Sequence, residues 1–221
     1  MSNAPDCLWP FCGKAAIFDF DGTLADTSHI WHSVDLAFLG KRGLPYDDDY
    51  PQRLATLGFV DGAQYTIERY GLNETVEDIC AEWQTSSRDL YRSEVTLRPG
   101  AERYIMALRD QGIPCALATT NSPAVLESMR HLDVCALFDA RVYAQDVGKS
   151  KDHPDIYLEA AKRLGANPHD CIVFEDVCNA LQTVQRAGMT ACGVRANDPS
   201  QPKETRDVAD LWLEDWRDIV M

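Results

Sequence analysis

Short apolar segments of strand length recur along this chain of 221 residues, and most are followed by polar residues and then by a helical pattern. The first is the run AAIFDF at residues 15–20, which leads into acidic residues and a glycine turn. A last strand and helix are predicted within residues 209–221. Repeated strand–helix units predict a parallel sheet with helices on both faces, a Rossmann-like α/β core. The other predicted strands are 114–118, 140–143, 171–174 and 190–194, and the helices are 101–111, 123–132, 154–164 and 178–187.

Residues 28–92 interrupt this alternation, because they contain no strand-like apolar block. Helical patterns are predicted there at residues 28–40, 61–70 and 73–92, with glycines and prolines between them. A helical stretch of this size between two α/β segments predicts an inserted α-helical domain. We therefore expect two domains, listed here with their bounds: an α/β core of residues 1–27 and 96–221, and a helical domain of residues 28–95.

The charge of the chain narrows the choice of partners. There are 21 Lys and Arg against 35 Asp and Glu, a net charge of −14, which repels nucleic-acid phosphates and anionic lipid surfaces. No apolar run approaches the length of a membrane span, and no signal peptide is recognised. We expect a cytoplasmic protein that binds a small molecule and neither nucleic acid nor membrane. A phosphorylated substrate would need local positive charge at its site.

The eight cysteines form no Cys-x-x-Cys pair, and most lie within apolar runs. They are interpreted as buried, reduced residues, with a zinc site or a disulfide framework as the weaker alternative. The first dozen residues are left out of the predicted fold.

Polar residues follow the predicted strands where ligands bind in open α/β sheets, outside the carboxyl ends of the strands. Asp19 and Asp21 are two residues apart, so on an extended chain both carboxylates could face one site. Two close carboxylates repel unless a cation or a shared proton intervenes. This pair could therefore hold Mg²⁺, and it could supply a nucleophile beside a general acid/base.

Three further strand ends carry suitable groups. Hydroxyl and amide groups follow the strand at 114–118, and they could bind phosphoryl oxygens. Lysines precede the helix predicted at 154–164, next to a helix N-terminus that favours anions. Acids follow the strand at 171–174, where burial is costly without a metal or partner. Each group alone could be a turn former, a helix cap or a surface residue, but their shared position favours function. The residues are Thr119, Thr120, Asn121, Lys149, Lys151, Glu175 and Asp176.

These segments resemble the four motifs of the haloacid dehalogenase-like (HAD) superfamily, over about residues 15–215. The first motif resembles Asp19-Phe20-Asp21-Gly22-Thr23-Leu24, and the second resembles Ala118-Thr119-Thr120-Asn121. The third resembles Lys151 with Pro154-Asp155-Ile156-Tyr157, and the fourth resembles Val173-Phe174-Glu175-Asp176. The insertion after the first motif resembles the family's helical cap, as in the branch of β-phosphoglucomutase and phosphoglycolate-type phosphatases. The family's capped members are often monomers, so a monomer is expected.

The resemblance implies a phosphatase that hydrolyses a small phosphorylated metabolite through an aspartyl-phosphate. It implies that Asp19 attacks phosphorus, and that Asp21 protonates the leaving group and then deprotonates water. Thr119 would hydrogen-bond the phosphoryl group and Lys151 would neutralise it. Such chemistry depends mainly on positioning and charge neutralisation.

The resemblance also implies a Mg²⁺ site. The ligands would be the Asp19 carboxylate, the Asp21 backbone carbonyl and Asp176, with support from Glu175. The metal would screen Asp19 from the anionic substrate. At the third motif, Ser150 and Asp152 stand where the family often has Gly and Pro, and Asp152 adds negative charge beside Lys151. Lys149 is a competing candidate, although the spacing to the helix favours Lys151.

Three alternatives are weighed. Dehalogenases of this superfamily lack an acid at the position of Asp21, so they are disfavoured. β-Phosphoglucomutase has a His and an Arg in its cap; here Trp31 takes the His position with His32 beside it, and residues 57–61 contain no Arg. The phosphomutase thus remains the alternative. A non-catalytic binding protein would be expected to lose Asp19, Asp21 or Lys151, and all three are present.

Substrate choice is expected to lie in the cap, which would close over the site. Candidate contacts to the substrate are Thr120 and Asn121 in the core and Trp31, His32, Gly58 and Phe59 in the cap, with Arg53 and Arg69 as further candidates. The alternative is that the aromatic residues pack within the cap and that the arginines are solvated.

Overall fold

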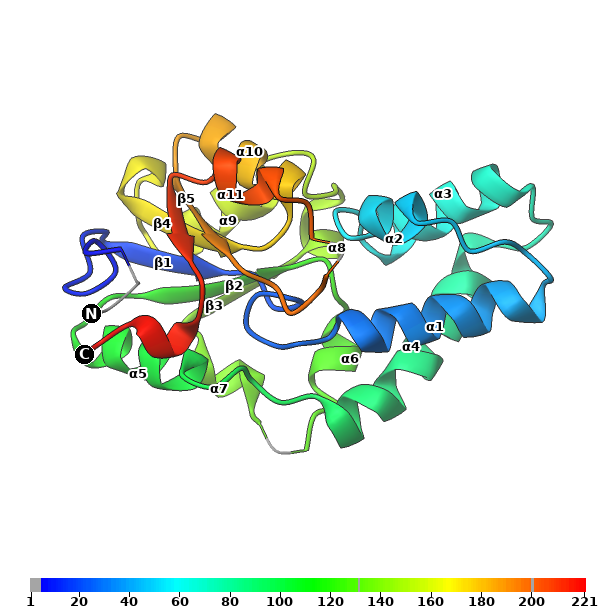
Figure 1. Ribbon diagram of the computed structural model, residues 1–221, viewed down its shortest axis with the longest axis horizontal. Coiled ribbons are helices and arrows are strands. Elements are labelled where there is room, and N and C mark those ends of the chain that lie inside the picture. Colours follow the sequence, from blue (N-terminus) through cyan, green and yellow to red (C-terminus); the bar gives the residue numbers. More distant parts are fainter. Residues whose placement is uncertain (1–4, 131, 200) are drawn as a thin grey trace.

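The computed structural model describes residues 5–130, 132–199 and 201–221. Their strands form one parallel sheet in the order β3-β2-β1-β4-β5-β6, drawn in Figure 1. This arrangement confirms the predicted Rossmann-like α/β core. The strands are β1 (Ala15–Phe18), β2 (Cys115–Thr119), β3 (Ala140–Tyr143), β4 (Cys171–Glu175), β5 (Thr190–Val194) and β6 (Leu211–Leu213).

Helices cover both faces of the sheet because each central strand is apolar on both sides. In β1, Ala16 and Phe18 belong to one buried cluster, whereas Ala15 and Ile17 belong to another. Figure 1 shows α9 and α10 above the sheet and α5 and α7 below it. These helices are α5 (Ala101–Asp110), α7 (Val134–Leu137), α9 (Asp155–Arg163) and α10 (Cys178–Arg186); the shorter elements are α6 (Pro123–Leu126), α8 (Ala144–Val147), α11 (Glu204–Val208), η1 (Pro168–Asp170) and η2 (Trp216–Asp218).

Four helices lie between β1 and α5 in the chain and extend to one side of the sheet (Figure 1). They share a hydrophobic cluster of their own, which includes Phe38, Tyr50 and Trp83. The predicted patterns had found three of the four. The second was missed because it has only six residues, with Pro51 in its first turn. The helices are α1 (Ser28–Lys41), α2 (Asp49–Leu54), α3 (Phe59–Tyr70) and α4 (Val76–Glu94).

The helix predicted at 123–132 is shorter in the structure, since α6 ends at Leu126. Ser122 caps its start by accepting a hydrogen bond from the Val125 backbone N at 3.3 Å. The Ser128 hydroxyl then donates to the Val125 carbonyl at 2.6 Å. A serine that bonds to a nearby carbonyl competes with the helical pattern, so the apolar spacing overestimated this helix.

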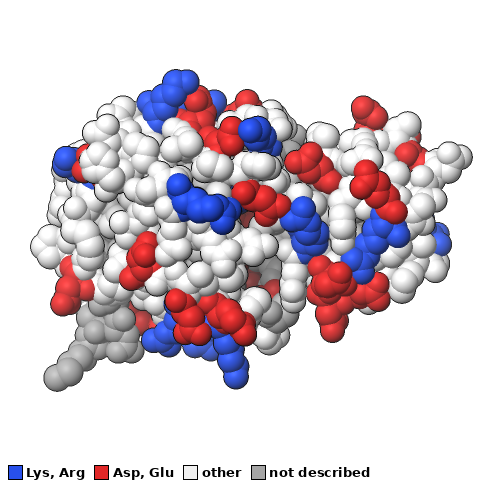
Figure 2. All heavy atoms as spheres, turned by 90° about the horizontal axis from the view of Figure 1, so that it is seen from above, with Lys and Arg blue, Asp and Glu red and all other residues white. Residues whose placement is uncertain are grey.

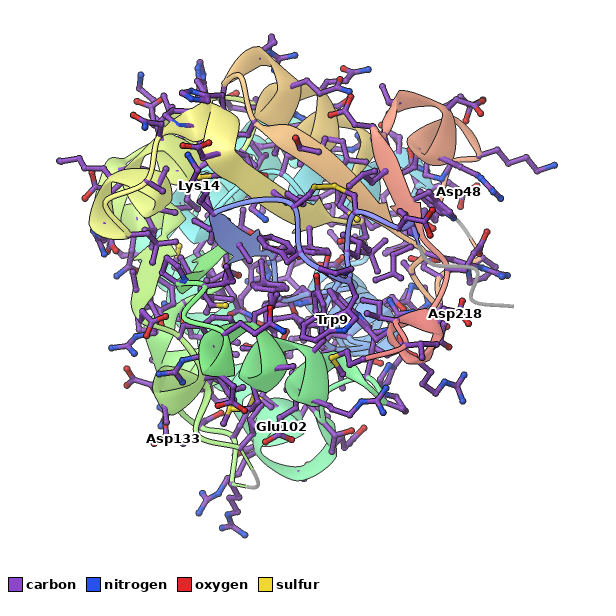
Figure 3. All side chains as sticks on the ribbon, turned by 90° about the vertical axis from the view of Figure 1, so that its left-hand side faces the viewer. Trp9, Lys14, Asp48, Glu102, Asp133 and Asp218 are labelled. Atoms are coloured by element: carbon purple, nitrogen blue, oxygen red, sulfur yellow. A yellow bond between two sulfur atoms is a disulfide. The ribbon has the colours of Figure 1, made fainter. Side chains whose placement is uncertain are left out.

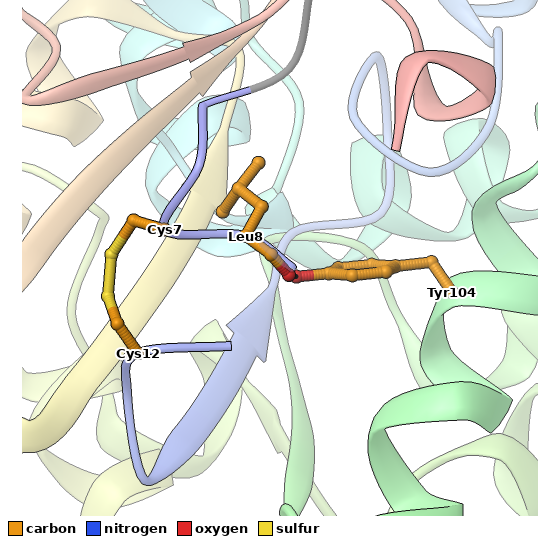
Figure 4. The surroundings of a disulfide bond; sticks show 4 residues. All are labelled: Cys7, Leu8, Cys12 and Tyr104. Carbon is orange, nitrogen blue, oxygen red and sulfur yellow. Dashed lines mark hydrogen bonds between the residues drawn. A yellow bond between two sulfur atoms is a disulfide. The ribbon is translucent and has the colours of Figure 1, made fainter. Parts of the chain in front are cut away.

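The N-terminal segment is part of the core, contrary to its omission from the predicted fold. Leu8 is fully buried, and the Tyr104 hydroxyl donates to its carbonyl at 3.0 Å (Figure 4). Cys7 and Cys12 form a disulfide, labelled in Figure 4 and drawn as a yellow bond in Figure 3. Their Cα atoms are 5.2 Å apart because the chain turns back on itself between them.

The disulfide corrects the prediction that all cysteines are reduced. Free cysteines are Cys80, Cys115, Cys171, Cys178 and Cys192, while the side chain of Cys135 lies outside the described residues. The cytoplasmic location relied partly on reduced cysteines and stays a prediction.

The helices and the surface charge bear on the expected absence of membrane binding and on the net negative charge. Within the described ranges, no helix has both the length and the apolar character that crossing a membrane requires. On the face shown in Figure 2, acidic and basic side chains are intermixed over the surface.

Candidate active site

The parallel register brings the ends of β1, β2 and β4 together. Phe18 pairs with Leu117 of β2 and with Phe174 of β4. The Asp19 backbone N then donates to the Phe174 carbonyl at 3.0 Å. The residues that follow at these strand ends therefore lie at one edge of the sheet, where ligands bind in such folds.

Lys151 lies between two of the acids at this edge. Its Nζ is 2.5 Å from Asp19 Oδ1 and also donates to Glu175 Oε1. The Tyr157 hydroxyl donates to the same Glu175 oxygen at 2.8 Å. Only 2% of Lys151 is exposed. Burial lowers the pKa of Lys151, but the carboxylates of Asp19 and Glu175 together raise it above its ordinary value, so the lysine stays a cation.

Lys149 has different surroundings. Its side chain is half-exposed and pairs with Asp155 at 3.3 Å. Of the two candidate lysines, the structure therefore brings Lys151, and not Lys149, into contact with Asp19.

Asp19, Glu175 and Asp176 form a group whose ligand atoms lie within 4.8 Å of one another. Burial raises the pKa of Asp19, against the lowering effect of Lys151. Burial and then the charge of Glu175 raise the pKa of Asp176 to about 7. Three acids with one lysine leave excess negative charge, which a cation would neutralise. Carboxylate oxygens are the donors that hard divalent cations such as Mg²⁺ prefer, so these residues could hold a metal.

The glycine turn after β1 is shaped around this group. Gly22 has φ +83°, a left-handed conformation that favours glycine. A Cβ atom there would lie 2.2 Å from Asp176 Oδ2. The Thr23 hydroxyl donates to Asp176 Oδ1 at 2.9 Å. The Gly-Thr pair of the first motif thus fixes the position of an acid 153 residues further along the chain.

The Asp21 carboxylate has neutral donors around it and is not one of the three acids of that group. Thr27 donates to its Oδ1 at 2.7 Å, and Asn121 donates to its Oδ2 at 2.9 Å. Trp31 Nε1 donates to Oδ1 at 3.2 Å, and the Tyr91 hydroxyl donates to the same oxygen. These bonds occupy the Asp21 carboxylate, so the expected role of Asp21 in the metal site, through its backbone carbonyl, stays a prediction.

The second motif supports this arrangement. Thr119 is fully buried at the end of β2, and its hydroxyl oxygen accepts a bond from the Asn121 backbone N at 3.0 Å. Thr120 follows and is partly buried, and its carbonyl would be 3.9 Å from a Cβ atom at Gly58. That same Cβ would lie 3.0 Å from Ala144 Cβ, so the loop before α3 approaches the core closely.

Two further contacts join this loop region to the third motif. The Lys151 backbone N donates to the Thr56 carbonyl at 2.8 Å. Arg53 pairs with Asp152, with 2.6 Å between Nη1 and Oδ2. This ion pair gives a physical account of Asp152, because the acid beside Lys151 neutralises an arginine.

The candidate substrate contacts of the helical region fall into two groups. Trp31, which donates to Asp21, lies edge to face with Phe59, with ring centroids 5.8 Å apart. His32 is exposed and its Nδ1 is 3.0 Å from the Tyr46 hydroxyl. Arg69 pairs with acids of its own region, Asp47 and Asp49. Within the part of the chain that the structure describes, neither His32 nor Arg69 is hydrogen-bonded or ion-paired with Asp19 or Asp21.

The sequence reasoning missed Thr27 and Tyr91. Thr27 immediately precedes α1, where it resembles a helix cap, although its side chain makes no capping bond there. Tyr91 occupies the buried face of α4 together with Ile79, Trp83 and Ser87, four residues apart in each case. That spacing signals burial but not the partner.

Comparison with known proteins assigns the family. The family model described as haloacid dehalogenase-like hydrolase matches residues 16–194. The chain belongs to this family, in the branch that includes β-phosphoglucomutase, which confirms the predicted membership and the prediction of a HAD-like phosphoric monoester hydrolase as the enzyme class.

Individual relatives show the breadth of that branch. A bifunctional riboflavin kinase/FMN phosphatase from Arabidopsis thaliana is 32% identical over 98% of this chain, and the chain spans 58% of that protein's length. A β-phosphoglucomutase from Bacillus subtilis is 30% identical over 91% of this chain and 92% of its own. The crystal structure of CbbY from Rhodobacter sphaeroides with phosphate has 24% identity and a TM-score of 0.79, covering 92% of this chain and 95% of that one. The last likeness establishes the fold.

Proposed function

We propose that the protein is a magnesium-dependent phosphatase that hydrolyses a small phosphorylated metabolite through an aspartyl-phosphate on Asp19. The observation that carries the proposal is the environment of Asp19, which lies 2.5 Å from Lys151 and near the buried Glu175 and the partly buried Asp176. A phosphoryl group brings negative charge to a carboxylate, so a fixed cation must lie beside the nucleophile.

In the first step, an Asp19 oxygen forms a bond to phosphorus while the ester P–O bond breaks. Asp21 gives its proton to the departing oxygen. In the second step, Asp21 takes a proton from water as the water attacks the aspartyl-phosphate, and phosphate leaves. Lys151 neutralises the phosphoryl oxygens, and the Thr119 hydroxyl hydrogen-bonds one of them.

Asp19, Glu175 and Asp176 would hold Mg²⁺, with the Asp21 backbone carbonyl as a further ligand. When bound, the metal supplies charge neutralisation for the phosphoryl group beside Asp19.

We also propose that residues 28–95 are a cap domain on a core of residues 1–27 and 96–221. A separate hydrophobic cluster within α1–α4 supports this division. The contacts of Thr56 and Arg53 with the third motif support a cap that covers the site. Thr120, Asn121, Trp31, Gly58 and Phe59 would then border the leaving group. His32 would contact substrate only if it left Tyr46. A monomer in the cytoplasm remains our expectation.

The test is hydrolysis of p-nitrophenyl phosphate, with and without Mg²⁺, by the wild type and Asp19→Asn. Turnover should require the metal and be lost in the variant. Asp26→Asn is the matched control, because Asp26 is on the same turn but pairs with Asn197 at 3.0 Å. A folded, magnesium-loaded wild type without turnover would argue against a general phosphatase.

A phosphomutase is the second candidate, favoured by the β-phosphoglucomutase relative, which matches over nearly its full length. Against the phosphomutase, residues 57–61 contain no Arg. The nearby Arg53 is already paired with Asp152, so it is not free to bind a substrate phosphate. Incubation with β-glucose 1-phosphate separates the two candidates: release of inorganic phosphate supports the phosphatase, and formation of glucose 6-phosphate supports the mutase.

A further inference from the structure

The Tyr91 hydroxyl occupies the centre of the hydrogen bonds around Asp21. It donates to Asp21 Oδ1, and it lies 3.0 Å from both Asn121 Nδ2 and Trp31 Nε1. Its ring is fully buried and stacks near Phe20, with centroids 6.5 Å apart. Residue 91 is 70 positions from Asp21 in the sequence, so this contact exists only in the folded protein.

The direction of each hydrogen bond is fixed by chemistry. An asparagine amide nitrogen and an indole nitrogen can only donate, so both donate to the Tyr91 oxygen. A phenol has one hydrogen to give, and Tyr91 gives it to Asp21 Oδ1. Tyr91 therefore accepts from Asn121 and Trp31 and donates to Asp21. Burial, and then the charge of Asp21, raise the pKa of Tyr91, so the phenol keeps that proton.

The contacts also bind Asp21 to two regions of the chain. Asn121 follows β2, whereas Trp31 and Tyr91 belong to α1 and α4. The Asn121 amide donates to both Asp21 Oδ2 and Tyr91, so it spans the carboxylate and the phenol. Loss of the Tyr91 hydroxyl would leave Asn121 and Trp31 each with one acceptor fewer.

We propose that Tyr91 is a positioning residue that holds the Asp21 carboxylate in place for proton transfer to and from the reacting oxygens. The inference rests on the proposed function, in which Asp21 is the general acid/base. It assigns to a helix of the proposed cap the task of orienting a core carboxylate, so that α4 contributes to chemistry as well as to covering the site.

The test compares two substrates that differ in how much they need a proton. p-Nitrophenolate is a stable leaving group, whereas phenolate is more basic and gains more from protonation. The value of kcat/KM covers the steps up to the aspartyl-phosphate, where the leaving group departs. In Tyr91→Phe, kcat/KM for phenyl phosphate should fall about tenfold more than for p-nitrophenyl phosphate, a fraction of the usual acid–base contribution.

The matched control is Tyr104→Phe. Tyr104 is also fully buried, and its hydroxyl donates to the Leu8 carbonyl, away from Asp21. It should leave the ratio of the two substrates unchanged. An equal loss on both substrates in Tyr91→Phe would show a merely structural role and overturn the inference. If Tyr91→Phe does not fold, Tyr91→Met, which also lacks the hydroxyl and adapts to an irregular core, is read in the same way.

The outcomes separate this inference from the function on which it rests. Wild-type turnover that disappears in Asp19→Asn, with an unchanged substrate ratio in Tyr91→Phe, keeps the phosphatase and rejects Tyr91 as a positioning residue. Absence of turnover in a folded, magnesium-loaded wild type rejects both.

Discussion

Asp19 and Asp21 are separated by one residue, yet their surroundings have little in common. Asp19 is 4% exposed and lies against Lys151, near two other acids. Asp21 receives hydrogen bonds from uncharged groups: a threonine, an asparagine, an indole and a phenol. The environment of Asp19 contains a cation that can neutralise negative charge. The environment of Asp21 contains neutral donors that can orient its carboxylate and add little net charge.

This difference explains how the first motif can supply both the proposed nucleophile, Asp19, and the proposed general acid/base, Asp21. A nucleophile that must meet a phosphoryl group needs cations nearby, because like charges would otherwise keep them apart. A group that transfers protons needs a fixed orientation towards the reacting oxygens. The same residue type can serve both because the fold determines the neighbours.

The largest predicted effect is on turnover, and it comes from removing the cation beside Asp19. Lys151→Met should lower turnover of p-nitrophenyl phosphate by about a hundredfold to a thousandfold, because it removes the cation that faces both Asp19 and the phosphoryl group. Lys149→Met is the matched control, since that lysine pairs with Asp155 at the surface. Thermal unfolding of both variants checks the fold. A loss below tenfold in a folded Lys151→Met would break the contrast between the two aspartates.

A smaller effect is expected at the turn between them. Gly22→Ala puts a Cβ atom 2.2 Å from Asp176 Oδ2, so Asp176 must move. The affinity for Mg²⁺ should fall about tenfold to a hundredfold, as for other residues that orient metal ligands. Gly43→Ala is the control for backbone strain. Gly43 also has a positive φ, at +64°, but a Cβ atom there meets nothing within 4 Å, so this variant is strained without displacing Asp176. Equal magnesium titrations for the two variants would contradict this prediction.

A third aspartate sharpens the comparison, because the buried Asp35 has, in the described parts of the chain, neither a neighbouring cation nor a set of neutral donors. Asp35 lies on the buried side of α1, and among the described residues no donor or cation is paired with its carboxylate. Burial raises its pKa from 3.8 to about 7, while its neighbours Tyr46 and Tyr50 stay neutral at such pH because their pKa values are also raised by burial.

The sign of the pH effect follows from that shift. Because the folded protein holds the proton more tightly than the unfolded chain, Asp35 favours folding most below pH 4, and this stability is lost as pH rises towards 7. Asp35→Asn should therefore increase the free energy of unfolding by about 2 kcal/mol more at pH 8 than at pH 5. Denaturant unfolding of both proteins at the two pH values measures this. A gain that is the same at both would mean that Asp35 is ionised without penalty.

The sequence indicated the residues at the strand ends because the pattern there is local. An apolar run followed by Asp19, Thr119 or Glu175 can be recognised within a few positions, and the parallel sheet then brings these ends together. The fold class followed from the same runs. The two-residue spacing of Asp19 and Asp21 suggested that both carboxylates could face one site, but it could not indicate the neutral donors that surround Asp21.

The remaining features depend on contacts that local patterns do not contain. Tyr91 reaches Asp21 from a helix 70 residues away. The bond between Cys7 and Cys12 depends on how the N-terminal segment turns against the core. The short helix α2 lacks the length that makes a helical period recognisable.

The contact between Thr56 and Lys151 joins a carbonyl to a backbone N–H. Main-chain groups are common to nearly every amino acid, so exchange of the side chain at either position, proline at 151 aside, keeps the donor and the acceptor. The helical region can thus change its side chains over evolutionary time while its loop keeps the same backbone contact with the core. New substrate preferences could arise there without the loss of the hydrogen bond to Lys151.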